Sequence, residues 1–187
     1  MAQARRSSLA ILLAALALLS FAAAAVTITN ITEWHVQSAG TPPVVKMAGE
    51  DVDGSLLSVS TYYNASDGTN RTVITIRGYT GDPTKYDEAI KICNTYGTGP
   101  FTVSLKYNGV LSGSWTYVRY LKLWLGTLES PLTIDSSTTV GRTLGSVTLN
   151  PGQCVSVAAE VLVDANTPSS EWYKDLIVIE VDVVSTG

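Results

Sequence analysis

The sequence has only one histidine, His35, and only two cysteines, Cys93 and Cys154. A single histidine leaves no base for most arrangements that activate a serine or cysteine nucleophile. His35 follows Trp34 in an apolar-polar alternating segment, so an exposed strand position is its expected place. Two cysteines cannot complete a tetrahedral zinc site, and no glycine-rich phosphate loop precedes a helical segment. The sequence therefore predicts no enzyme activity, no cofactor and no metal.

Charge is also scarce, at 15% of residues. If Arg5 and Arg6 are removed with an N-terminal signal, 10 basic and 16 acidic residues remain, a net charge of −6. Nucleic acids and anionic membranes bind basic surfaces, so neither is an expected partner.

The first 24 residues have the pattern of a secretory signal peptide. Two arginines precede an apolar run over residues 9–21, and four alanines at 22–25 supply small residues for cleavage. The run is shorter than the roughly 20 apolar residues that a membrane span needs, and no later run reaches that length. We therefore expect cleavage near Ala25 and a secreted chain without a membrane span.

Two further features suit an extracellular location. A disulfide between Cys93 and Cys154 is favoured over two free thiols, and it would contribute on the order of 4 kcal/mol by closing a long loop. Three Asn-x-Ser/Thr sequons, at Asn30, Asn64 and Asn70, are candidate glycosylation sites. Asn64 and Asn70 are the stronger pair because they lie in a predicted turn.

Apolar and polar residues alternate with period two along most of the chain after the signal. This pattern indicates antiparallel strands with one face on a core, and Gly, Asn and Pro punctuate the turns between them. The predicted strands cover 26–37, 55–63, 72–79, 89–95, 101–107, 116–125, 143–149, 155–163 and 177–183. These nine or so strands predict an all-β fold, an antiparallel β-sandwich of jelly-roll type, with its domain at residues 44–187. Only residues 82–89 are compatible with a short helical turn, opened by Pro83.

Two groups of carboxylates are candidate sites. The first group lies opposite the apolar parity of its strands and could converge as an acid/base pair: Glu160, Glu180 and Asp182. Outward positions of strands are polar in any case, so this pattern is also expected without catalysis. The second group, in the loop at residues 50–54, could hold a hard cation. Its members are Glu50, Asp51 and Asp53. This loop lacks full calcium-loop spacing, so a solvated turn is the favoured interpretation.

Aromatic residues offer a different hypothesis, a monomeric carbohydrate-binding or cell-surface module. A stripe of aromatic rings can stack on sugars, but aromatics also populate strands for packing reasons, and packing in the core or an interface is favoured here. The candidates are Tyr62, Tyr63, Trp115, Tyr117, Tyr120 and Trp124.

The segment 26–37 forms a strand pattern that starts where the signal ends. Its anchors share one parity: Val26, Ile28, Trp34 and Val36. Ile31 is out of phase with these anchors, and Asn30 falls on the apolar side of the strand. Two interpretations remain: a bulge near Asn30 brings Ile31 among the anchors, or Asn30 is buried and unglycosylated. From these residues alone, the strand could pair within its own subunit or with a neighbour.

Three stretches together resemble a known family. Residues 89–105 contain a strand ending in Asn94, a Gly-Thr-Gly-Pro turn and an alternating strand. Residues 149–157 contain an Asn-Pro-Gly turn that feeds another alternating strand, and residues 176–184 form a last strand near the C-terminus. With the signal peptide, these stretches resemble the TasA/camelysin-type biofilm fibre proteins and, more closely, the archaeal bundling pilins.

That resemblance implies an extracellular filament that serves adhesion or biofilm cohesion. Each subunit would donate its N-terminal strand to complete a neighbour's sandwich, a form of β-augmentation, and head-to-tail contacts that do not close give a filament. Residues 25–43 would then be the donor strand and linker, with 37–43 crossing between subunits. The implied partners are identical subunits and neighbouring filaments in bundles.

N-terminal sequencing of the secreted protein tests the signal assignment. We expect the mature chain to start at Ala25 or Val26. In a type IV pilin-like protein the apolar stretch is retained as a helical fibre core, so a start near Ser7 or Leu9 would contradict donor-strand assembly.

Overall fold

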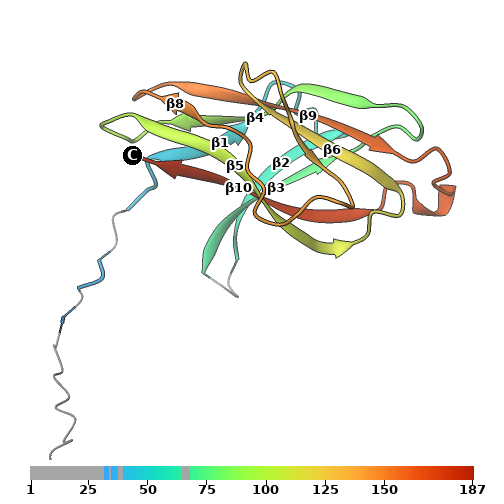
Figure 1. The fold of residues 1–187 in the computed structure, drawn as a ribbon, viewed down its shortest axis with the longest axis horizontal. Coiled ribbons are helices and arrows are strands. Elements are labelled where there is room, and N and C mark those ends of the chain that lie inside the picture. Colours follow the sequence, from blue (N-terminus) through green and yellow to red (C-terminus); the bar gives the residue numbers. More distant parts are fainter. Residues whose placement is uncertain (1–31, 34, 38–39, 65–67) are drawn as a thin grey trace, which may run out of the picture. The chain divides into compact units, whose positions relative to one another are not determined.

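The computed structural model describes residues 32–33, 35–37, 40–64 and 68–187 (Figure 1). The chain divides into two units, Met1–Ser38 and Ala39–Gly187, and the architecture below is that of the second. The proposed signal peptide lies outside the described residues. Among those that are described, no helix has the length and apolar character needed to cross a membrane.

The described residues form ten strands and one short 3-10 turn. In chain order they are β1 Val44–Ala48, β2 Leu57–Asn64, β3 Thr69–Ile76, β4 Thr84–Asn94, β5 Phe101–Gly113, β6 Val118–Leu125, β7 Leu132–Ile134, β8 Val147–Leu149, β9 Cys154–Val163, η1 Ser169–Glu171 and β10 Ile177–Thr186. They build a five-stranded sheet in the order β1-β4-β9-β6-β7, a three-stranded sheet in the order β10-β5-β8, and the hairpin β2-β3. All pairings between these strands are antiparallel. From β4 onward the chain passes repeatedly between the two larger sheets, so the predicted antiparallel sandwich is confirmed.

The two larger sheets pack face to face through one apolar core. Its buried members come from both sheets and from the loop before β8: Ile90, Ile92, Val103, Leu105, Tyr107, Leu125, Leu132, Ile134, Leu144, Leu149, Val155 and Val157. The strand β9 shows why the sequence folds this way, because its odd-numbered residues from Val155 to Val163 are all buried while the residues between them are half-buried. The period-two pattern therefore reports directly which face lies on the core.

The hairpin β2-β3 packs on the core at its base only. Leu57 is fully buried against Tyr86, Ala89 and Ala159, whereas three large apolar side chains farther along are exposed: Tyr62, Val73 and Ile74. Figure 1 shows the far half of this hairpin projecting beyond the two larger sheets.

Two predictions about secondary structure need correction. The strands β1 and β7 were not predicted, because five and three residues are too few to display a period. The proposed helical turn at residues 82–89 is wrong, since β4 already begins at Thr84 and contains an irregularity between Tyr86 and Ile90. Of these residues, 84–86 pair with β9, and 87–89 lie in the bulge.

Asn94 explains the Asn-turn-Pro motif of the sequence. Its side chain is fully buried, and its amide nitrogen donates to the carbonyl oxygens of Gly99 (2.9 Å) and Leu149 (3.0 Å). Its side-chain oxygen accepts a bond from the N–H of Gly97 at 3.1 Å. One amide thus joins the end of β4, the turn into β5 and the end of β8.

We expect Asn94→Ala to lower the free energy of unfolding by about 3 kcal/mol, because it leaves these buried backbone groups without partners. Chemical denaturation followed by tryptophan fluorescence measures the change. Asn150→Ala, which truncates an exposed asparagine at the same end of the sandwich, is the matched control and should change stability by less than about 0.5 kcal/mol. Equal losses of stability in the two variants would show that the Asn94 side chain does not hold these three chain segments together.

Candidate functional site

The most distinctive feature of the fold is the outer edge of β10. This strand pairs with β5 along one edge, and in the described part of the chain no strand pairs with its other edge. Ten residues of extended backbone therefore present a row of N–H and C=O groups on the outside of the sheet. A long unpaired edge is a ready template for another strand.

The side chains on the inner face of β10 are incompletely covered. Ile179, Val181 and Val183 pack against the main core but stay half-buried. Their neighbours on β5 at the same depth are sealed: Val103 is 0% exposed and Leu105 is 2% exposed. Both strands carry the same alternating pattern, so the difference comes from their positions in the sheet. β5 has β10 on one side and β8 on the other, whereas β10 pairs with β5 alone among the described strands. We call β10 with these three side chains the open edge.

The open edge keeps a regular strand geometry. The register with β5 shifts twice, between Val178 and Ile179 and between Glu180 and Val181. In both places the pairing skips a residue of β5, Leu111 and then Asn108. The extra residues thus lie on β5, and β10 itself remains free of the bulges that often protect edge strands.

The hairpin β2-β3 lies alongside the open edge without pairing to it. Arg71 Nη1 is 3.9 Å from Glu180 Oε2, and Ile76 and Ile177 pack against the same small cluster of buried valines. β3 and β10 nevertheless belong to separate sheets. Val59 and Ile74, which face each other on the hairpin, add further incompletely buried apolar surface, with Ile74 40% exposed.

The other edges of the two larger sheets are shorter. β1 offers five residues, and β7 and β8 offer three each. A hollow of about 570 Å³ adjoins β8; residues 147–149, 153–156 and 126–127 line it. This hollow is the main alternative to the open edge as a place for an added strand.

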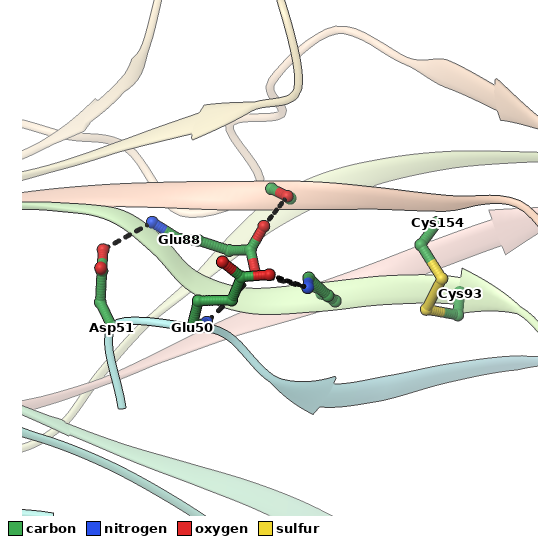
Figure 2. A network of polar contacts seen from close by, with 7 residues as sticks. Glu50, Asp51, Glu88, Cys93 and Cys154 are labelled. Atoms are coloured by element: carbon green, nitrogen blue, oxygen red, sulfur yellow. Dashed lines mark hydrogen bonds and ion pairs between the residues drawn. A yellow bond between two sulfur atoms is a disulfide. The ribbon is translucent and has the colours of Figure 1, made fainter. Parts of the chain in front are cut away.

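The acidic loop at residues 50–54 is bound to the bulge of β4 (Figure 2). The N–H of Asp51 bonds to the carbonyl of Glu88, and the carboxylate of Asp51 accepts the N–H of Glu88 at 2.8 Å. Gly49 makes this approach possible, because a Cβ there would lie 1.9 Å from the carbonyl oxygen of Glu88. The loop therefore supplies hydrogen-bond partners to a strand segment that the bulge removes from its ladder.

The three carboxylates of this loop have different partners. Glu50 binds Lys91, Asp51 binds Glu88, and Asp53 accepts the N–H groups of Ser55, Leu56 and Leu57. The N–H of Leu57, followed by the Ser55 hydroxyl, holds the pKa of Asp53 well below its ordinary value. Among the described residues the structure brings together no group of three or more His, Cys, Asp or Glu side chains that could hold a metal.

Glu88 is the centre of the polar network in Figure 2. Its carboxylate lies 2.8 Å from Lys91 Nζ and accepts bonds from the Ser156 hydroxyl and the N–H of Glu50. The hydrogen bond from Lys91 is the largest of the causes that lower the pKa of Glu88. The network ties the first loop to β4 and β9.

The three carboxylates considered as a possible acid/base pair do not all converge on one face. Glu160 lies on the outer face of the five-stranded sheet, where Lys122 Nζ at 2.9 Å lowers its pKa. Glu180 and Asp182 lie on the outer face of the three-stranded sheet and share the side-chain amide of Asn108. Because the sheets pack through their inner faces, Glu160 lies on the opposite side of the sandwich from Glu180 and Asp182.

The candidate aromatic side chains that the structure describes do not form a continuous exposed stripe. Trp115 packs against the core. Tyr120 and Trp124 share the outer face of β6, but Lys122 Nζ lies 4.2 Å from the ring centre of Tyr120 and Lys85 Nζ lies 5.7 Å from that of Trp124. Packing, the favoured interpretation, holds for Trp115, and the half-buried rings of Tyr120 and Trp124 each have a cationic partner.

The structure places the remaining predicted residues as follows. Cys93 and Cys154 form the expected disulfide between β4 and β9, with a sequence separation of 61. Asn64 and Asn70 lie in the hairpin strands β2 and β3, and their side chains are outside the described part. Val26, Ile28, Asn30, Ile31 and Trp34 are also outside it. Val36 is described; its side chain is 94% exposed, and residues 32–33 and 35–37 do not lie in a strand.

Comparisons with known proteins add no relative: no family model matches the chain, and no curated protein is significantly similar to it.

The Glu88 network predicts an acid-sensitive fold. The pKa of Glu88 is lowered in the folded state from an ordinary value of 4.5, so its contribution is present above that pH and is lost as the pH falls through the folded value. We expect Glu88→Gln to lose less stability than the wild type between about pH 6 and about pH 3. Urea unfolding at both pH values measures this. Glu129→Gln, at an exposed loop residue, should follow the wild type, and an identical acid loss in the Glu88 variant would contradict the assignment.

Proposed function

We propose that this protein is a secreted, non-enzymatic structural subunit of an extracellular filament used for adhesion or biofilm cohesion. Subunits join head to tail when the N-terminal segment of one chain, residues 26–36, adds as a strand to the sandwich of the next. The observation that carries this proposal is the sandwich's long unpaired edge with half-buried apolar side chains.

The physical basis is strand addition at an exposed edge. Backbone hydrogen bonds supply affinity, and alternate side chains of the added strand cover apolar positions. The shared apolar parity of Val26, Ile28, Trp34 and Val36 suits a strand that is added in this way. The same patch cannot serve both sides of such a contact, so assembly continues as an open chain of subunits.

Other features suit a fibre subunit outside the cell. The Cys93–Cys154 disulfide is a device that persists in oxidising surroundings. The carboxylates that sequence reasoning offered for catalysis are divided between opposite faces and have structural partners. Sequence resemblance to biofilm fibre proteins and archaeal bundling pilins points to the same assembly.

Deleting residues 26–37 from the mature chain tests this function. We expect the secreted variant to remain monomeric, with polymer yield reduced by at least about tenfold, because the strand that supplies the backbone bonds is gone. Sedimentation and electron microscopy of the purified protein measure the polymer. Filaments that still form from the deletion variant would refute strand donation.

Paired substitutions in the full chain supply a matched control for the deletion. Ile28→Asp with Trp34→Asp places charges on the anchor face and should abolish polymer. Thr29→Asp with His35→Asp introduces the same two residues on the other face and should leave polymer largely intact. Equal loss in both double variants would mean that the segment does not act as a strand with one buried face.

A further inference from the structure

The geometry points to the outer edge of β10 as the acceptor of the neighbour's strand, with the donated residues 26–36 running antiparallel to β10. This inference rests on the proposed function and adds to it the acceptor strand and the polarity. Strand length, uncovered apolar surface and the position of the chain's entry into the domain each bear on it.

Strand length separates the candidate edges. The donor segment has about eleven residues, and β10 has ten, whereas β1 has five and β8 three. Each added residue contributes backbone bonds only where it meets an extended partner. A three-residue edge would leave most of the donor's N–H and C=O groups without partners in the acceptor, so β10 is the one larger-sheet edge among the described residues that can pair with most of the donor.

Uncovered apolar surface favours the same edge. Ile179, Val181 and Val183 are half-buried on β10, and Val59 and Ile74 on the neighbouring hairpin are also incompletely covered. A strand at this edge would bury these positions with its own apolar parity. Three valine or leucine side chains line the hollow beside β8: Val147 is half-buried, and Leu149 and Val155 are already 3% and 8% exposed. A strand there would therefore bury less new apolar surface.

The polarity follows from where the chain enters the domain. The carbonyl of Pro43 accepts the N–H groups of Thr95 and Tyr96, so the linker joins the sandwich at the end that carries the disulfide. The final residue of β10, Thr186, lies at that same end, opposite Thr102. The opposite end of the sandwich carries the start of β10, where Ile177 pairs with Gly113.

In a head-to-tail filament, a segment that leaves one subunit at its disulfide end enters the next at the opposite end. The linker 37–43, which spans up to roughly 23 Å when extended, makes this crossing. The donor's C-terminal residues then lie near Ile177 and its N-terminal residues near Thr186. Because β10 runs from Ile177 to Thr186, the donor runs antiparallel to it.

Cysteine pairs in the mature full-length chain test the acceptor and the polarity together. Thr29→Cys with Val184→Cys, and His35→Cys with Val178→Cys, place thiols on the outward parity of donor and acceptor. The antiparallel arrangement predicts that a short bismaleimide links both pairs between subunits, at least about tenfold faster than the swapped pairs Thr29/Val178 and His35/Val184. The two acceptor positions are six residues, roughly 20 Å, apart, so one arrangement cannot satisfy both sets.

Each outcome is decisive. Preferential linkage of the swapped pairs would overturn the polarity. Linkage of Thr29→Cys to Thr148→Cys on β8 or to Lys46→Cys on β1, with none to β10, would overturn the acceptor while leaving the filament proposal intact. Wild-type mature protein that forms no polymer at all would refute the proposed function itself.

Hydrogen exchange on the wild-type protein provides a second measurement that needs no substitution. Amides of β10 should exchange at least about tenfold more slowly in the polymer than in the freshly secreted monomer, because the open edge gains backbone partners. Amides of β8 serve as the internal comparison and should change little. Protection confined to β8 would overturn the choice of β10.

Discussion

The requirement that backbone N–H and C=O groups find partners governs this structure. Nine of the ten described strands are short, paired on both sides or part of the separate hairpin, and β10 is the exception. Its ten residues pair on one side only, and its inward apolar side chains are half-buried. An edge this long and regular favours association with another chain, so the same constraint that organises the core also predicts a partner.

Elsewhere the domain satisfies its polar groups internally. Asn94 joins three chain segments at the disulfide end, Asp53 caps its own turn, and the first loop supplies partners to the bulge of β4. No buried side-chain nitrogen or oxygen in the described part of the chain lacks a hydrogen-bond partner. The contrast with β10 is therefore local: among the described strands of the two larger sheets, it is the long one with a neighbour on one side only.

Sequence patterns predicted the long strands well and the short or irregular ones poorly. β5, β9 and β10 follow the period-two alternation because each has one face on the core. β1 and β7 are too short to show a period, and residues 82–89 have a helix-compatible composition that pairing with β9 overrides. The convergence considered for the candidate carboxylates was wrong for another reason. The parity of a strand residue shows that its side chain points away from the core, but it does not show to which of the two sheets that strand belongs.

The sequence by itself determined that the chain forms an antiparallel sandwich, that Cys93 and Cys154 can pair, and that a strand-like segment precedes the domain. These conclusions need only local periodicity and residue chemistry. Tertiary structure alone decided which strand lies at an open edge. β9 and β10 alternate alike in sequence, yet β9 is sealed between two neighbours and β10 is not. Burial depends on contacts between distant segments, and a local pattern carries no information about which strand lacks its neighbour.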